Sequence, residues 1–322
     1  MKYYRLKTKN PYYNLAIEEY LFTECDEDII MLWQNEPSVV VGVNQNIRAE
    51  VDMAYLASHG VHPVRRITGG GAVYHDAGNI NYTFIGKNEG GIDFARFSSP
   101  IIEALASLGV TLSLSGRNDL CLPDGRKVSG GAEASRGGRI LHHGTLLFNA
   151  DMDALGKILT PSPEKLATKA IKSTKSRVAN LKELLPDIEC AEELIEKIEK
   201  YVIEVLGATP SNIPTDEKIN ALRERNSSEG WLYPNRGISS EISITKRARF
   251  PYGTISVDVS IIGEKIKDIR FSGDFFGELP IEALEEALRG VSISAIEDSL
   301  DESLLDSSIK GMRYDDLISL LS

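Results

Sequence analysis

Short apolar runs and clusters of turn-forming residues alternate through the first half of the chain. The runs from Ile29 to Trp33, Ser38 to Val43 and Val61 to Ile67 have the length and composition of strands. Turns at Pro123-Asp124-Gly125 and Gly137-Gly138 separate further apolar runs by only a few residues. Because strands joined by short turns run antiparallel, the pattern predicts an α/β fold with a mixed, mostly antiparallel sheet.

Helical spacing and helix-capping residues occur between these strands. Asn10-Pro11 predicts a helix start, with Asn as the N-cap and Pro at the first position. The segment from Asp52 to Ser58 predicts a short helix, and Ser99-Pro100 predicts the start of another that ends at Gly109. Residues 186–206 carry Glu and Lys on one face of a further predicted helix.

The pattern changes after a polar, glycine-bearing stretch from Asn226 to Ser240. Apolar and polar residues alternate from Ala248 to Ile262, a turn follows at Gly263-Glu264-Lys265, and a second run returns to Phe271. Short helices follow this hairpin. The pattern predicts two domains, a larger one over residues 1–244 and a small α/β domain over residues 245–322.

Composition narrows the class of protein. The chain has 322 residues, 42% hydrophobic and 26% charged, which is typical of a globular protein with about two domains. A net charge of -11 argues against nucleic-acid binding. We expect no membrane span and no signal peptide. The chain has three cysteines, Cys25, Cys121 and Cys190, and no CxxC motif. An odd number of widely spaced cysteines favours a reducing, cytoplasmic location over a disulfide framework or a zinc site.

Three consecutive glycines, Gly69 to Gly71, lie between two strand signals. Backbone without a Cβ can approach a ligand closely and direct N–H groups at it. Arg65 and Arg66 precede the glycines and offer charge for an anion, and His75-Asp76 follow them. P-loop and dinucleotide-binding glycine motifs are absent. The stretch therefore indicates a nucleotide or acyl-phosphate site, although a tight hairpin without a ligand would also use glycine.

Other residues extend this hypothesis with less specificity. Lys127, on a short glycine-bounded strand, could stabilise charge on a carboxylate and an α-phosphate, or could be a solvated hairpin lysine. His142 and His143 are neighbours on a predicted strand, so at most one of them should face a given site. Cys121 could be a nucleophile, but a buried strand cysteine is the simpler interpretation. From Lys165 to Arg177 the chain is basic without an acid, which favours an anionic partner over a solvated face.

Several motifs, in order, together resemble the bacterial lipoate–protein ligase A family, which belongs to the biotin/lipoate protein ligase superfamily. The resemblance extends over nearly the whole chain, because the accessory-domain hairpin from Phe250 to Phe271 also matches. The catalytic-domain motifs are Arg65 to Phe84, Gly116 to Leu120, Lys127 to Gly130, Leu141 to Leu147 and Lys175 to Leu181. Gly131 departs from the family, which often has a small or polar residue there.

This resemblance implies a catalytic domain of the biotin–protein ligase and class II synthetase type, followed by a C-terminal accessory domain. It implies that lipoate and Mg-ATP give lipoyl-AMP and pyrophosphate. The adenylate then acylates a lysine of lipoyl domains, in 2-oxoacid dehydrogenase acyltransferase subunits, or of glycine cleavage H protein. Lipoate or octanoate would be the small-molecule substrate. We expect no nucleic-acid or membrane partner and a monomer.

The resemblance also implies roles for individual residues. Lys127 would be the catalytic residue, contacting carboxylate and α-phosphate, and Asp119 would lie on the nucleotide and Mg side with Asn79. The remaining substrate- and adenylate-binding residues would be Arg66, Thr68, Gly70, Gly71, Ala72, Val73, Tyr74, His75, Gly130, Gly144 and Thr145. Lys172, Lys175 and Arg177 would lie on a loop that closes over the adenylate, as shielding an acyl-phosphate from water requires.

Two alternatives use the same motifs differently. An octanoyl- or lipoyl-transferase of this fold would work through an acyl-cysteine. Relatives of that type generally lack the accessory domain, and no cysteine follows the His-Gly-Thr strand here. A non-catalytic carrier-binding paralogue would not need Lys127 and the triple glycine intact.

Overall fold

The computed structural model describes residues 1–159, 177–234, 238 and 244–321. The larger domain contains the strands β1 (Lys2–Arg5), β2 (Ile29–Trp33), β3 (Ser38–Val41), β4 (His62–Arg65), β5 (Val73–His75), β6 (Asn79–Lys87), β7 (Ser113–Ser115), β8 (Asp119–Cys121), β9 (Lys127–Arg136), β10 (Arg139–Leu147) and β11 (Thr209–Pro210). Its helices are α1 (Pro11–Glu24), α2 (Ile47–Glu50), α3 (Met53–His59), α4 (Phe94–Ala106), α5 (Met152–Ile158), the 3-10 helix η2 (Leu181–Glu183), α7 (Ala191–Glu204), α8 (Glu217–Ser227) and α9 (Glu229–Leu232). No helix in the described part of the chain is long and apolar enough to cross a membrane.

The main sheet has eight strands in the order β11-β1-β2-β6-β10-β9-β8-β7. β1 runs parallel to β2 and β11, and the other neighbours are antiparallel. The prediction of a mixed, mostly antiparallel sheet is therefore confirmed. A second sheet, β4-β3-β5, has one parallel and one antiparallel pair.

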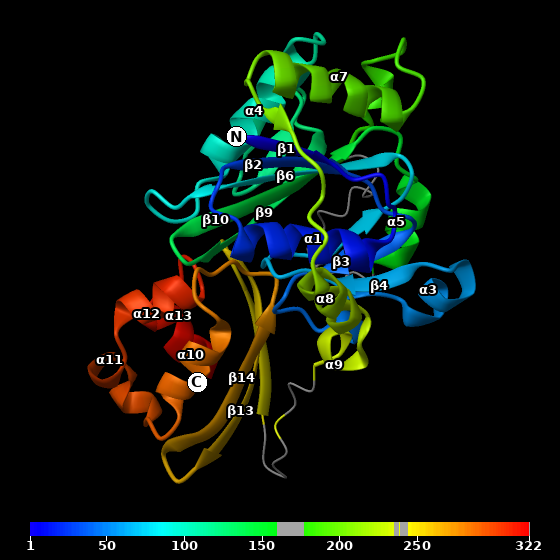
Figure 1. The fold of residues 1–322 in the computed structure, drawn as a ribbon. Helices are drawn as coiled ribbons and strands as arrows, with labels where there is room; N and C mark the ends of the chain where they lie inside the picture. Colours follow the sequence, from blue (N-terminus) through cyan, green and yellow to red (C-terminus); the bar gives the residue numbers. More distant parts are fainter. Residues whose placement is uncertain (160–176, 235–237, 239–243, 322) are drawn as a thin grey trace.

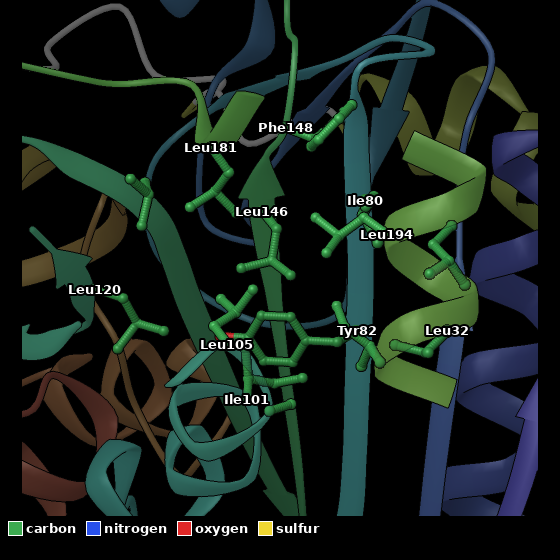
Figure 2. Close-up of a cluster of buried hydrophobic side chains, with 14 of the residues drawn as sticks. Leu32, Ile80, Tyr82, Ile101, Leu105, Leu120, Leu146, Phe148, Leu181 and Leu194 are labelled. Atoms are coloured by element: carbon green, nitrogen blue, oxygen red, sulfur yellow. The ribbon is translucent and has the colours of Figure 1, made fainter. Parts of the chain in front are cut away.

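Each face of the main sheet is covered by a different layer. On one face, Ile101 and Leu105 of α4 and Leu194 of α7 pack against sheet residues such as Tyr82 and Leu146, as Figure 2 shows. On the other face, α1 and the small sheet bury a second cluster that includes Ile17, Met31, Trp33, Val40 and Val64. The candidate site lies in this second layer, between the two sheets.

The C-terminal part forms its own core. It consists of β12 (Ile244–Phe250), β13 (Gly253–Ile262) and β14 (Lys265–Gly273), followed by α10 (Ile281–Leu288), η3 (Ile293–Ala295), α11 (Ile296–Ser299), α12 (Glu302–Ser308) and α13 (Tyr314–Leu321). The three strands form one antiparallel sheet, and the helices pack on it (Figure 1). The predicted long strand from Ala248 to Ile262 is wrong in its start, because residues 251–252 turn the chain between β12 and β13.

Two other predictions about elements are corrected by the structure. α4 begins at Phe94, where the Asp93 side chain accepts a hydrogen bond from Arg96 N, and Pro100 lies inside the helix. Burial of Phe97, Ile101 and Leu105 on the same helix offsets the backbone hydrogen bond that this proline removes. The polar stretch from Asn226, a candidate boundary, begins inside the larger domain, because Asn226 lies in the last turn of helix α8, is buried and donates from Nδ2 to Tyr12 O.

Candidate functional site

A cavity of about 130 Å³ lies between the main sheet and the β4-β3-β5 sheet. One wall is apolar and comes from α1, β2, β3 and the start of β5. The other walls are glycine backbone and polar side chains. The cavity is lined by Leu15, Trp33, Val40, Arg66, Gly71, Ala72, Val73, His75, Asn81, Asn118, Lys127, Gly130, Gly131, Ala132, His143, Gly144 and Thr145.

The register of the main sheet determines which side chains face this cavity. Asn81 of β6 pairs with Trp33 of β2 on one side and with Thr145 of β10 on the other. Gly130 N on β9 donates to Thr145 Oγ1 at 3.3 Å. Because cross-strand partners share a face, these residues form a row that crosses the sheet from β2 to β9. Gly130 N and Trp33 mark the two ends of this row.

The loop between β4 and β5 holds the triple glycine. Gly70 has a φ of 88°, a conformation that favours glycine, and a Cβ on the neighbouring Gly42 would collide with Gly70 O. Arg66 Nη2 donates to Gly69 O at 2.6 Å and to Gly71 O at 2.9 Å, and Nη1 donates to Val40 O. The Arg66 guanidinium therefore shapes the loop from inside.

Both arginines of the pair are buried, at 2% exposure for Arg65 and 5% for Arg66. Arg65 donates to carbonyl oxygens of the 42–45 loop and of α9, namely Gly42, Val43, Gln45, Trp231 and Leu232. The prediction that both supply charge for an anion is corrected for Arg65, whose donors bind carbonyls. Burial, together with Arg65, lowers the pKa of Arg66 to about 10, so Arg66 remains charged at the cavity wall at neutral pH.

A buried hydrogen-bonded chain connects α1 to this loop. Arg66 Nε donates to Thr68 Oγ1 at 2.8 Å, so the Thr68 hydroxyl hydrogen is available to His143 Nε2 at 2.9 Å. His143 Nδ1 then donates to both carboxylate oxygens of Glu18 at 3.0 Å. The Arg66 N–H can only donate and the Glu18 carboxylate can only accept, so a His143 ring whose one hydrogen is on Nδ1 accepts at Nε2 from the Thr68 hydroxyl. Thr68 thus links the glycine loop, through Arg66, to the His143 side chain.

Lys127 lies at the β9 end of the cavity. Its Nζ is 2.7 Å from Asp119 Oδ1 on β8, and both side chains are about one-third exposed. A Cβ on Gly130 would meet the Lys127 Nζ at 2.7 Å, so bare backbone lets the ammonium group lie over this glycine. Lys127 N donates to Arg177 O, and Ala179 N donates to Lys127 O, which ties residues 177–179 to the same strand.

His75 faces the apolar end of the cavity beside Trp33, with ring centroids 6.4 Å apart. Asn35 Nδ2 donates to His75 Nδ1 at 3.1 Å. Burial, with Arg66 and His143 nearby, lowers the pKa of His75 to about 3, so the ring is neutral at physiological pH. A neutral ring that accepts at Nδ1 carries its hydrogen on Nε2.

The accessory domain packs directly on the triple glycine. Gly70 N donates to Phe275 O at 3.0 Å. A Cβ on Gly70 would lie 2.9 Å from the Phe276 ring, and Arg117 stacks its guanidinium on the same ring at 5.5 Å from the centroid. In this arrangement the Gly70 N–H is therefore used by the accessory domain.

Models of known families match both domains. The lipoyl protein ligase A/B catalytic domain matches residues 10–203, and the bacterial lipoate protein ligase C-terminus matches residues 239–321. The lipoate–protein ligase LplJ of Bacillus subtilis is 36% identical over 324 residues, which cover 97% of each chain. The chain belongs to the lipoate–protein ligase family. It is accordingly an enzyme of the ligase class, as the sequence predicted.

Solved structures of lipoate–protein ligases have the same fold. Plasmodium falciparum LipL1 in complex with lipoate is 25% identical, with a TM-score of 0.79 over 99% of this chain and 98% of that one. A bipartite lipoate protein ligase studied with its E2 lipoyl domain, from Thermoplasma acidophilum, is 28% identical with a TM-score of 0.62, over 74% of this chain and 98% of that one. A lipoate–protein ligase A bound with ATP is 25% identical with a TM-score of 0.60, over 72% and 98%.

The structure brings most of the predicted ligase residues to one cavity. Those that line it are Arg66, Gly71, Ala72, Val73, His75, Lys127, Gly130, Gly144 and Thr145. Asp119 contacts the site through Lys127, and Thr68 contacts it through Arg66 and His143. Lys172 and Lys175 lie outside the described residues, and Arg177 is exposed and joins the site through its backbone.

Gly70, Tyr74 and Asn79 are further predicted residues that do not line the cavity. The Tyr74 side chain points to the opposite face of β5, among Val39, Val41 and Leu56, because neighbours on a strand face opposite ways. Burial raises its pKa to about 12. Asn79 is fully buried behind the lining and donates from Nδ2 to Asn81 Oδ1 at 3.0 Å. In this arrangement neither the Tyr74 nor the Asn79 side chain faces the cavity.

Most of the lining residues that the sequence did not single out lie on helices and strands away from the triple-glycine loop. Alternating Asn79, Asn81 and Thr83 on β6 is a periodic signal that could have identified Asn81 as facing a site. No local signal identifies the apolar wall, which α1, β2 and β3 bring together in three dimensions. The lining residues to which the sequence assigned no binding role are Leu15, Trp33, Val40, Asn81, Asn118, Gly131, Ala132 and His143. As expected for strand neighbours, His143 faces the cavity and His142 faces away, toward Glu133.

Proposed function

We propose that this ligase activates free lipoate with ATP and transfers the lipoyl group to a lysine of a lipoyl domain. In the first step a lipoate carboxylate oxygen attacks the α-phosphorus of ATP, which forms lipoyl-AMP and releases pyrophosphate. In the second step the lysine ε-amine attacks the acyl carbon, AMP leaves, and the amine loses a proton as the amide forms. The observation that carries this proposal is an ammonium group, Lys127 Nζ, at the mouth of a glycine-walled cavity with an apolar far end.

Lys127 is proposed to stabilise the charge on the carboxylate and the α-phosphate as the anhydride forms. The backbone of Gly71, Ala72 and Val73 offers N–H groups to the adenylate at the cavity wall. The Gly70 N–H would join them only in an arrangement in which Phe275 O has released it. The narrow cavity would exclude water from the anhydride, which protects it from hydrolysis.

The residues present fit Mg²⁺ as a partner of the nucleotide phosphates. Among the described residues there is no group of three or more His, Cys, Asp or Glu side chains that could hold a metal ion. Asp119 supplies one partly exposed carboxylate next to Lys127. Mg²⁺ binds through one or two carboxylates and substrate phosphates, so Asp119 is the residue proposed to hold it. When bound, the ion would neutralise phosphate charge.

The acceptor is proposed to be a lipoyl domain, since one of the similar solved ligases was studied with its E2 lipoyl domain. Glycine cleavage H protein is a second proposed acceptor. A monomeric state, a cytoplasmic location and domains that meet at residues 244 and 245 stay predictions from the sequence.

A transferase that works through an acyl-cysteine is less consistent with the site. Cys121 is buried on β8, Cys25 is half-buried and Cys190 is exposed. None of these three described residues lines the cavity. Burial raises the pKa of the Cys121 thiol, which disfavours the thiolate that a nucleophile needs.

Lipoate-dependent exchange of labelled pyrophosphate into ATP tests the proposal directly. The wild-type protein should catalyse exchange, and Lys127→Ala should lower kcat/KM by about 100-fold or more. Melting temperature should stay near wild type, because a partly exposed ion pair contributes about 1 kcal/mol or less. Lys310→Ala is the matched control, since Lys310 Nζ forms a 2.7 Å pair with Asp306 on the accessory domain. Folded wild-type protein without exchange activity would overturn the proposal.

A further inference from the structure

Two buried hydrogen-bonding groups at the apolar end of the cavity have no partner among the described residues. They are His75 Nε2 and Asn81 Nδ2. His75 is 3% exposed and Asn81 is 1% exposed, and both line the cavity. A buried polar group without a partner is costly, so each one needs an explanation.

Contacts behind each group determine its hydrogen-bonding role. Asn14 Nδ2 donates to the carbonyl oxygen of Gln34 and to Asn35 Oδ1, which leaves Asn35 Nδ2 to donate to His75 Nδ1. His75 therefore presents an N–H at Nε2. Asn79 Nδ2 donates to Asn81 Oδ1, so Asn81 presents its NH₂ group. The two groups are both donors, and what they lack is an acceptor.

Water is a poor occupant for this position. An ordered buried water needs two to four polar partners, including acceptors for its own hydrogens. The neighbouring lining residues at this end are Leu15, Trp33, Val40 and Val73, which offer apolar surface. The acceptor Asn79 Oδ1 also has no partner among the described residues, but Asn79 does not line the cavity. An acceptor on the ligand itself fits better.

The sheet register indicates which part of the ligand reaches these donors. Lys127 lies over Gly130 on β9, whereas Asn81 lies on β6, with β10 between them. Two strand spacings separate β9 from β6, which is roughly 10 Å. That length suits an acyl chain whose carboxylate is at Lys127 and whose far end lies beside Asn81, Trp33 and His75. In lipoate, the only acceptors at that far end are the two sulfur atoms of the dithiolane ring.

We infer that His75 Nε2–H and the Asn81 amide donate to the dithiolane sulfurs and so select lipoate over acyl chains that lack them. This inference rests on the proposed adenylation of lipoate and assigns the selectivity to a donor pair. Sulfur is a weak acceptor, so the bonds themselves are modest. The preference for lipoate arises mainly because a sulfur-free acyl chain is disfavoured. Such a chain leaves both buried donors without a hydrogen-bond acceptor in a dry site.

The sulfur atoms can be tested apart from the ring. The carbocyclic isostere 5-cyclopentylpentanoate has the ring and chain of lipoate without sulfur. In pyrophosphate exchange, the wild-type kcat/KM should favour lipoate over the isostere by about tenfold or more. Equal use of the two acids by wild-type protein would overturn the inference without any variant. Exchange with neither acid would instead overturn the proposed function.

Variants identify the donors. His75→Phe and Asn81→Leu keep similar volume but remove the N–H groups, so each should bring the lipoate-to-isostere ratio toward one. Ser38→Ala is the matched control, because Ser38 pairs in register with His75 and has a buried hydroxyl without a partner among the described residues, but does not line the cavity. That control should keep the wild-type ratio. Equal losses with both acids in His75→Phe and Asn81→Leu would show a merely structural role and overturn the inference.

Discussion

Substitutions of Thr68 can distinguish a structural role of this residue from a ligand-binding role. Its hydroxyl accepts from Arg66 Nε and donates to His143 Nε2, and the residue is fully buried. It does not line the cavity, although the family resemblance places it at the substrate. Thr68→Val removes the hydroxyl at nearly constant volume and leaves both partners without their bond.

The expected cost follows from those two partners. Leaving a buried donor or acceptor unsatisfied costs about 1–3 kcal/mol each, and somewhat more for a charged donor. Arg66 keeps its bonds to the carbonyls of Val40, Gly69 and Gly71, which limits its share. The free energy of unfolding should therefore fall by about 2–4 kcal/mol in Thr68→Val.

Denaturant unfolding, followed by the fluorescence of Trp33 and Trp231, measures this change beside pyrophosphate exchange. Thr68→Ser keeps the hydroxyl and should lose less stability than Thr68→Val. Thr68→Val combined with His143→Phe should cost less than the sum of the two single variants, because they share one hydrogen bond. A Thr68→Val protein as stable as wild type, with a reduced kcat/KM for lipoate, would refute the structural role and favour direct contact with substrate.

Other features give shorter predictions. Gly144→Ala should lower the free energy of unfolding by about 1–3 kcal/mol, since its Cβ would collide with the buried Tyr82 ring, and unchanged stability would contradict that packing. Replacing all three cysteines should leave lipoylation of an acceptor domain intact, whereas lost activity would revive the acyl-cysteine mechanism. Between about pH 6 and 4, the unfolded state binds a proton at His75 that the folded state, with a pKa of about 3, does not. Stability should therefore fall by about 1.4 kcal/mol per pH unit as pH drops, and His75→Phe should flatten that slope in acid titrations. Phe276→Ala should speed amide hydrogen exchange at Gly70, and unaltered exchange would show that this ring does not hold the domains together.

Local sequence was sufficient where the physical cause is local. Asn10-Pro11 specified the start of α1, because the Asn10 side chain caps Tyr13 N within one turn. The period of two placed His142 and His143 on opposite faces, and the same period places the His75 side chain in the cavity and the Tyr74 side chain outside it. The triple glycine and Lys127 could be recognised as motifs, because each depends on consecutive residues. The first is a run of residues without a Cβ, and the second is a lysine on a short strand bounded by glycines.

Tertiary structure decided what each group is free to do. The sequence shows two adjacent arginines, but only the fold shows that Arg65 is committed to the carbonyls of two distant segments while Arg66 remains charged at the cavity wall. It shows three glycines, but not that the accessory domain uses the Gly70 N–H. The apolar wall and the donors on His75 and Asn81 come from strands that meet only in the folded chain. The physical reason is that motifs record backbone requirements, whereas burial and hydrogen-bond satisfaction depend on neighbours far away in sequence.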